Sequence, residues 1–124
     1  RVSFTQADLF GPFNPKQYSG SIDVITCNPP YISTAKLKKL PLEIINYEPE
    51  EAFNGGPIGL NIILRLLKES PLYLKKGGWL CFEVGKGQGE LIAKIMSRNP
   101  HFGRIEFAND EEGNIRAIMA QINY

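Results

Sequence analysis

Residues 22–31 read IDVITCNPPY, and this run decides the fold. Its first six residues are largely apolar and β-branched, which is typical of a buried strand in a parallel sheet. The strand is predicted to stop at residue 28, because the two prolines that follow supply no N–H group to a sheet ladder. The turn Asn28-Pro29-Pro30-Tyr31 is therefore predicted at the carboxyl end of this strand.

Strands and helices alternate outward from this run. In chain order, the predicted elements are strands over 1–7 and 22–27, a helix over 58–69, a strand over 79–84, a helix over 88–98, and strands over 104–108 and 115–122. Pro71 is predicted to interrupt the first helix, and Gly77-Gly78 to stop the chain before the next strand. The short link between the last two strands predicts an antiparallel hairpin.

This alternation predicts an α/β fold. Its sheet should be open and mostly parallel, with helices on its faces and the hairpin at the C-terminal end. Ligands of such sheets bind outside the carboxyl ends of the strands. Asp8-Leu9-Phe10 and the turn at residues 28–31 both follow predicted strands, so we expect them on the same rim of the sheet.

Composition narrows the class of protein. The 124 residues suit one domain, and 43% hydrophobic residues with 22% charged residues are ordinary for a folded core. A net charge of +1 is too weak to imply nucleic-acid binding by charge alone, and no direct nucleic-acid partner is expected. The sequence has no apolar run long enough to cross a bilayer and no signal peptide. Cys27 and Cys81 are predicted to be buried, reduced thiols of a cytoplasmic protein, without a metal site.

The turn after residue 27 offers a rigid set of hydrogen-bond acceptors beside an aromatic ring. The side-chain oxygen of Asn28 and the carbonyl of Pro29 accept hydrogen bonds, and Pro29 and Pro30 restrict the backbone. Tyr31 adds a flat face. A planar –NH₂ group fits this set as a substrate, because its two N–H groups match the two acceptors. Fixed acceptors also favour the positive charge that develops when the nitrogen attacks a methyl donor.

A plainer interpretation treats the same residues as a turn or a short polyproline segment. The position of the motif directly after a strand favours the functional interpretation. Asp8 has a similar alternative, since an aspartate at a strand end can simply form a turn.

With these residues, the sequence resembles a known family. IDVITCNPPYI resembles motif IV of the class I amino-methyltransferases, which act on adenine N6 in DNA, guanine N2 in RNA or glutamine N5 in proteins. The run YEPEEAFNGG over 47–56, followed by Gly59-Leu60 and Arg65, resembles the HemK (PrmC) family of release-factor glutamine methyltransferases. Further matches are Gly77-Gly78, Glu83, Gly85, Gln88, Asp110, Gly113, Asn114 and Arg116. One departure is Ile58, where the family usually has Asp.

The resemblance implies a class I, Rossmann-like methyltransferase domain that is incomplete. Residues 1–124 would correspond to the part from the third strand onward, without the first strands and the cofactor-binding glycine loop. We therefore expect this chain alone to bind S-adenosylmethionine weakly. We also expect the strand over 22–27 to lack a neighbour on one side, which leaves an apolar edge prone to self-pairing.

The resemblance also assigns roles to residues. Asn28, Pro29, Pro30 and Tyr31 would be catalytic, gripping the glutamine carboxamide of a release-factor loop. Among the cofactor-binding residues, Asp8 would accept the adenine amino group of S-adenosylmethionine, Leu9 would cover the ring, and Asn28 would face the methionine part.

Three features are not assigned to the site. Gly85-Lys86-Gly87-Gln88-Gly89 looks like a nucleotide-binding glycine loop, but it matches the "E.G..Q" segment of the family instead. His101 is expected at the surface. The run KLKK over 36–39 is expected to be a solvated face, with contact to an acidic or RNA-bound partner as the alternative.

Two other functions are compatible with these residues. One is methylation of an exocyclic amine of a DNA or RNA base, which would need a basic surface or a target-recognition element. The other is a binding module that keeps the fold without catalysis. The motif at residues 28–31 favours an enzyme over the binding module.

Overall fold

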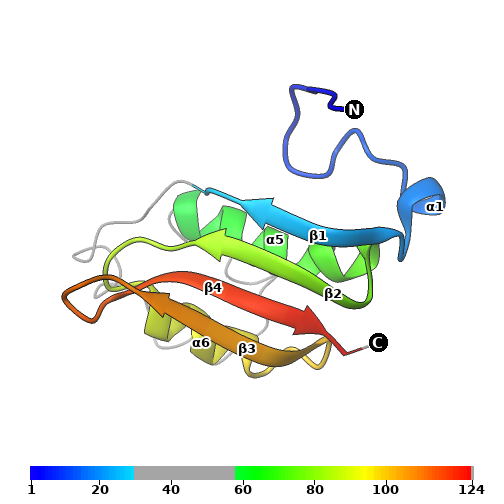
Figure 1. Cartoon of the computed structure of the whole chain (residues 1–124). Helices are drawn as coiled ribbons and strands as arrows, with labels where there is room; N and C mark the ends of the chain where they lie inside the picture. Colours follow the sequence, from blue (N-terminus) through cyan, green and yellow to red (C-terminus); the bar gives the residue numbers. More distant parts are fainter. Residues whose placement is uncertain (30–57, 124) are drawn as a thin grey trace.

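Four strands form one open, mixed sheet in a computed structural model that describes residues 1–29 and 58–123. The elements are α1 (Pro15–Tyr18), β1 (Ile22–Cys27), α5 (Ile58–Tyr73), β2 (Leu74–Glu83), α6 (Gly89–Met96), β3 (Phe102–Asn109) and β4 (Ile115–Ile122). The strand order is β1-β2-β4-β3, so the chain reaches the far edge with β3 and returns with β4 (Figure 1). β1 and β2 are parallel, whereas β4 is antiparallel to both of its neighbours. The predicted α/β class and the C-terminal hairpin are confirmed.

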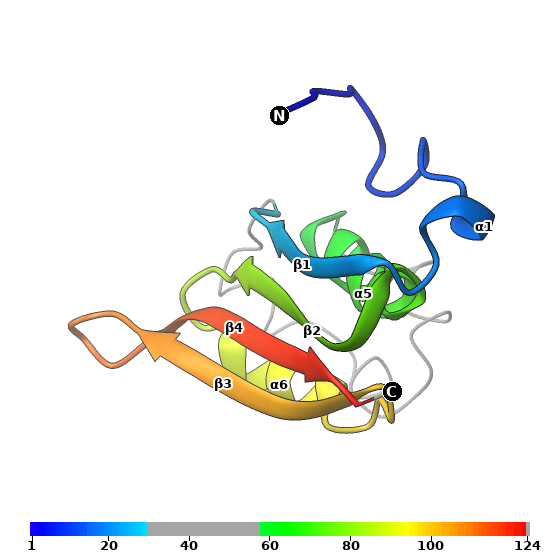
Figure 2. The same ribbon diagram turned by 45° about the vertical axis from the view of Figure 1, so that its right-hand side comes forward.

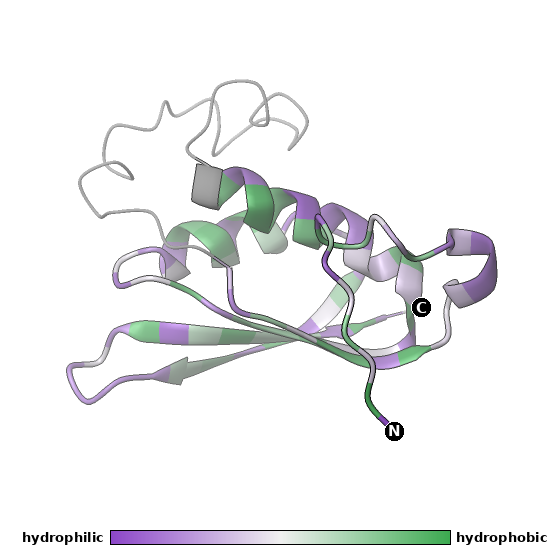
Figure 3. Ribbon diagram, turned by 90° about the horizontal axis from the view of Figure 1, so that it is seen from above, coloured by the Kyte–Doolittle hydropathy of each residue, from purple (hydrophilic) through white to green (hydrophobic). Residues whose placement is uncertain are grey.

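Both long helices lie on the same face of the sheet (Figure 3). The periodicity of their sequences explains this arrangement, since each has an apolar stripe that must be buried. The core between sheet and helices consists of Ile63, Leu66, Leu67, Leu74, Leu80, Phe82, Val84, Ile92, Met96, Phe102, Ile118, Ala120 and Ile122. This core fixes β2 and its neighbours, and therefore the rim where β1 and β2 end.

The opposite face of the sheet is covered by no helix within the described part of the chain. Trp79 and Cys81 alternate with the core residues of β2 and are only half-buried, and Val24 of β1 is 53% exposed. The prediction of a buried strand over 22–27 is therefore wrong for Val24, and Trp79 and Cys81 of the neighbouring strand are not fully buried either. An apolar run shows that a strand is suited to burial on both faces of a sheet. Burial also requires helices on the second face, and the strand sequence does not provide them.

Residues 1–7 do not form the predicted strand. They have no regular secondary structure, and Phe4 is 94% exposed. Figures 1 and 2 show this segment beyond β1, away from the sheet. Alternating residues set which side of a strand can be buried, but a strand also needs a partner for its backbone. Within residues 1–29 and 58–123, β1 is an edge strand and residues 1–7 do not pair with it.

Pro71 does not end α5, which continues to Tyr73. A proline in a helix leaves the carbonyl four residues earlier without its usual N–H donor. Here that carbonyl belongs to Leu67, and the side-chain Nδ2 of Asn99 donates a hydrogen bond to it at 3.4 Å. Asn99, which is 32 positions from Leu67, thus compensates for the proline, and no local pattern could have predicted this contact.

Gly77 and Gly78 lie inside β2 rather than before it. The pairing with β1 moves from Ile22–Leu74 to Val24–Trp79, so residues 75–78 bulge out of the ladder. Gly77 has a φ of 80°, which favours glycine. A Cβ on Gly78 would lie 2.9 Å from the carbonyl oxygen of Lys75 and 3.0 Å from that of Asp23.

We predict that Gly78→Ala lowers the free energy of unfolding by about 1–3 kcal/mol, because the new methyl group would displace backbone atoms of both strands. Urea denaturation of the two proteins measures the difference. Lys76→Ala is the matched control in the same bulge, because Lys76 is exposed and its replacement should change stability by about 0.5 kcal/mol or less. Equal effects of the two substitutions would contradict the role assigned to Gly78.

Candidate functional site

The structure describes the first two residues of the predicted catalytic turn. Asn28 is exposed and Pro29 is buried, directly after β1. Cys27 pairs with Phe82, so the carboxyl ends of β1 and β2 lie side by side at one rim of the sheet. This rim is where open α/β sheets bind ligands. Pro30 and Tyr31 lie outside the described residues, as do residues 36–39 and 47–57.

Asp8 and Leu9 lie in a pair of tight turns rather than at a strand end. The N–H of Gly11 donates to the carbonyl of Asp8 at 3.0 Å, and that of Phe13 donates to the carbonyl of Phe10 at 2.9 Å. Leu9 has a φ of 51°, a conformation that residues other than glycine seldom adopt. Such strain persists only where surrounding contacts hold it.

Side chains of α5 hold this segment in place. Nη1 of Arg65 donates to Oδ1 of Asp8 at 2.8 Å, and this hydrogen bond raises the pKa of the Arg65 guanidinium. The Phe10 ring stacks on the Tyr73 ring, with 4.7 Å between centroids. The Tyr73 hydroxyl also donates to the carbonyl of Phe13 at 3.3 Å. The sequence offered no sign of these contacts, since the partners are 57 or more positions apart and Arg65 was only a match to a family signature.

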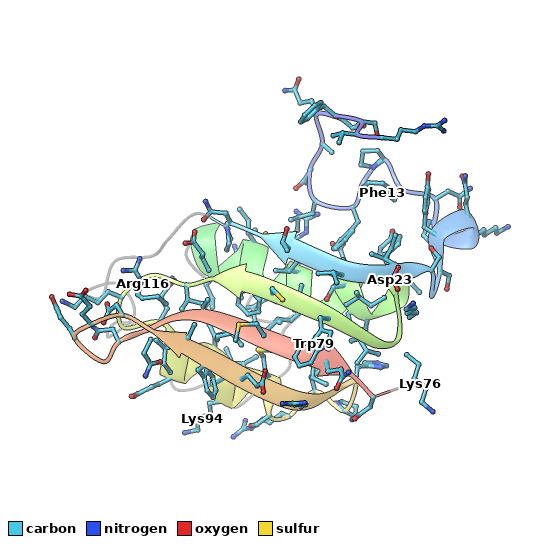
Figure 4. All side chains as sticks on the ribbon, viewed as in Figure 1. Phe13, Asp23, Lys76, Trp79, Lys94 and Arg116 are labelled. Atoms are coloured by element: carbon cyan, nitrogen blue, oxygen red, sulfur yellow. The ribbon has the colours of Figure 1, made fainter. Side chains whose placement is uncertain are left out.

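A mostly apolar cavity of about 300 Å³ lies between this segment, β1 and α5. Leu9 lines one side, Thr26 and Cys27 at the end of β1 line another, and Leu66 of α5 contributes a third. Figure 4 shows Phe13, which also lines the cavity, beyond the edge of β1. The structure therefore brings Leu9 and the residues just before Asn28 to one cavity. The prediction that Asp8 follows a strand is wrong, because Asp8 lies in a turn.

The glycine-rich run after β2 forms a closed turn. The N–H of Gly85 donates to Oε1 of Gln88 at 2.5 Å, and the backbone N–H of Gln88 donates to the carbonyl of Gly85 at 3.0 Å. Gln88 is fully buried, and a Cβ on Gly89 would overlap Ile115. The side chain of Gln88 accepts the hydrogen bond of the Gly85 N–H, a group that a phosphate-binding loop would donate to its ligand.

The last residues that match the family signature stabilise the hairpin of β3 and β4. Oδ1 of Asp110 accepts hydrogen bonds from the backbone N–H groups of Glu112 and Asn114, both at 2.9 Å. These hydrogen bonds lower the pKa of Asp110, and the bond from the Asn114 backbone has the largest effect. Nε of Arg116 donates to the carbonyl of Val84 at 3.2 Å and so ties β4 to the end of β2. These residues maintain the fold around the rim.

The remaining candidates lie away from this cluster or behave as ordinary side chains. His101 is exposed in the turn before β3, as predicted. Cys27 and Cys81 are free thiols, but both are half-buried rather than buried, and the burial they have raises the pKa of each thiol. No helix in the described ranges has the length and hydrophobicity needed to cross a membrane.

Comparison with known proteins shows what the chain is similar to. No family model matches the chain. Curated relatives do match it: the release factor glutamine methyltransferase of Geobacter sulfurreducens is 40% identical over 122 residues, and that of Thermodesulfovibrio yellowstonii is 38% identical over 120 residues. That of Bacillus cereus is 31% identical over 121 residues. These matches cover 97–98% of the chain.

The chain is a homologue of the release factor glutamine methyltransferases. The resemblance drawn from the sequence is confirmed. The chain spans about 41% of the length of the first two of these relatives. The homology therefore covers nearly all of this chain but less than half of each methyltransferase.

We predict that Asp110 makes the chain more stable at neutral pH than in acid. Its lowered pKa means that the folded state favours the carboxylate, so this contribution is present above the ordinary value of 3.8 and is lost as pH falls through the lowered pKa. The stability lost through Asp110→Asn should therefore shrink when urea denaturation is repeated well below pH 3.8. Glu111→Gln, an exposed neighbour, is the control. A loss that is the same at both pH values would show that the carboxylate charge is irrelevant.

Proposed function

We propose that the protein containing this chain transfers a methyl group from S-adenosylmethionine to the side-chain amide nitrogen of a glutamine in a peptide-chain release factor. The observation that supports this proposal best is the homology over nearly the whole chain to enzymes named release factor glutamine methyltransferase. The candidate site agrees with it chemically. Asn28 is an exposed carboxamide at the carboxyl end of a parallel strand, where a substrate can reach it.

The substrate nitrogen is proposed to lie between fixed acceptors. One of its N–H groups would donate to the side-chain oxygen of Asn28 and the other to the carbonyl of Pro29. Pro30 would restrict the backbone of the turn, and Tyr31 would pack on the plane of the carboxamide. The lone pair of an amide nitrogen is delocalised, so the reaction depends on alignment and on acceptors that stabilise the developing positive charge.

The residues on the other side of the cavity fit the adenine end of the cofactor. Asp8 is exposed, and Oδ2 of its carboxylate has no bonding partner among the described residues, which leaves one acceptor for an amino group. Leu9 lines the apolar cavity and can cover the face of a base. S-adenosylmethionine would supply a methyl group activated by its sulfonium centre, and Asn28 would also face the methionine part.

The partner is proposed to be the glutamine-bearing loop of a release factor, and the location the cytoplasm. A release-factor loop can present a carboxamide without unstacking a nucleobase, and a net charge of +1 offers little attraction to nucleic acid. We also propose that residues 1–124 alone bind S-adenosylmethionine weakly, because the glycine-rich run after β2 closes on itself.

We predict that Asn28→Ala in the complete protein lowers the rate of release-factor methylation by about 10²–10³-fold, the cost of removing one fixed hydrogen-bonding group from a transition state. Transfer of a labelled methyl group to release factor, DNA and ribosomal RNA, measured in parallel, tests both the residue and the substrate. Gln17→Ala, another exposed carboxamide on the same domain, is the control and should leave the rate unchanged.

Two results would overturn the proposal. Full activity of Asn28→Ala would remove the proposed mechanism, whatever the substrate. Methylation of DNA or ribosomal RNA in preference to the release factor would remove the proposed substrate and leave the role of Asn28 intact.

A further inference from the structure

We propose that Arg65 is a positioning residue for adenine recognition. It binds one carboxylate oxygen of Asp8 and thereby turns the other toward the amino group of the cofactor's adenine. This inference rests on the proposed function, since it takes Asp8 as the residue that binds adenine. It adds a residue of α5 to the cofactor site and gives that residue a specific effect, which is selection of adenine over other purines.

The bond geometry divides the carboxylate into two parts. Nη1 of Arg65 lies 2.8 Å from Oδ1 of Asp8, while Oδ2 has no bond within the described part of the chain. Glu69, one turn further along α5, lies 3.9 Å from Nη2 of Arg65 and keeps the guanidinium on this side of the helix. One oxygen is therefore fixed by the protein and the other remains available to a ligand.

Arg65 is held more firmly than the residue it binds. Its side chain is 33% exposed and extends from α5, where the adjacent residues Leu64 and Leu66 are both buried. The side chain of Asp8 is 78% exposed and belongs to a segment outside the sheet. Without the guanidinium, the carboxylate could rotate in solvent and would have to be ordered when adenine binds.

The same ion pair could be explained as an anchor for the segment alone. Exposed ion pairs contribute little to stability, however, and two other contacts already attach the segment to α5. These are the stack of Phe10 on Tyr73 and the hydrogen bond from the Tyr73 hydroxyl to Phe13. Arg65 is thus not the only attachment, and its distinctive effect is on the direction of the carboxylate.

The strained residue between the two attachments supports a binding role. Leu9 has its φ of 51° between Asp8, which Arg65 holds, and Phe10, which Tyr73 holds. In this conformation Leu9 lines the cavity, and Asp8 directly precedes it in the chain. An apolar wall beside an oriented acceptor is the arrangement that a purine with an exocyclic amino group requires.

Hypoxanthine provides the chemical test, because it replaces the amino donor of adenine with a carbonyl acceptor. An oriented carboxylate accepts a hydrogen bond from the amino group and repels the carbonyl oxygen. A freely rotating carboxylate must be ordered to make the favourable contact and can turn away from the unfavourable one. Loss of Arg65 should therefore reduce the preference for adenine rather than affinity in general.

We predict that Arg65→Met lowers the preference of the complete protein for S-adenosylhomocysteine over S-inosylhomocysteine by about 2- to 10-fold, the cost of ordering one side chain. Titration calorimetry of both compounds measures the preference. Asp8→Asn should reduce it as well, and Arg65→Met should have no further effect on the preference in the Asp8→Asn background. Lys68→Met, an exposed cation one turn away on α5, is the matched control and should leave the preference unchanged.

A second measurement needs no cofactor. Hydrogen exchange of the Gly11 and Phe13 amides should be nearly unchanged by Arg65→Met, because Tyr73 still holds the segment. If the methionine variant does not fold, Arg65→Lys replaces it. The lysine variant should lose part of the preference, since a single ammonium group lacks the planar fork of arginine.

The outcomes separate this inference from the proposed function. Faster exchange at Gly11 and Phe13, together with equal weakening of both compounds, would show that Arg65 is only an anchor. A wild-type protein that binds neither compound, or binds both equally, would overturn the assignment of Asp8 and the role of Arg65 together. Methylation of a substrate other than a release factor, with the adenine preference behaving as expected, would overturn only the proposed substrate.

Discussion

The parallel pairing of β1 with β2 is the contact on which the candidate site depends. It places Asn28 and the turn after β2 at the same rim, because both strands run in one direction and Cys27 lies opposite Phe82. The pairing is fixed from one side only. Leu80 and Phe82 pack under the helices, while β1 contributes half-buried side chains to the edge of the same core. The position of Asn28 is therefore set through β2 and its helices.

The other half of the candidate site is positioned by different means. Asp8 and Leu9 belong to no strand, and side-chain contacts from Arg65 and Tyr73 connect them to α5. Such contacts adjust more easily than a backbone ladder, so the two sides of the cavity differ in rigidity. A rigid acceptor group for the reacting amide and a more adaptable surface for the base are compatible with binding a large cofactor before a demanding alignment step.

Much of the fold could be predicted because periodicity depends on local sequence. The spacing of Leu60, Ile63, Leu64 and Leu67 identified a helix, and the short turn at residues 110–114 identified the hairpin. The errors arose where a distant residue decided the outcome. Asn99 accommodates Pro71 within α5, the carbonyl of Asp23 leaves no room for a side chain at position 78 inside the bulge, and residues 1–7 lack the pairing partner that their alternation requires. For the candidate site, the sequence indicated Asp8 and Asn28 but not the hydrogen bond between Arg65 and Asp8.

Burial divides the residues that match the family into two groups with different physical tasks. Gln88 is fully buried and its Oε1 accepts a hydrogen bond within its own turn, and Asp110 and Asn114 also bond to their own turn, so these atoms are used within the fold. Asp8 and Asn28 are exposed polar side chains whose chain neighbours Leu9 and Cys27 line an apolar cavity, and leaving exposed polar atoms free for a ligand costs little in the folded state. A match to a family motif does not distinguish these tasks, but the bonding state of each side chain does. Function is therefore best sought at the exposed pair and at Arg65, the residue that links one of them to the buried core.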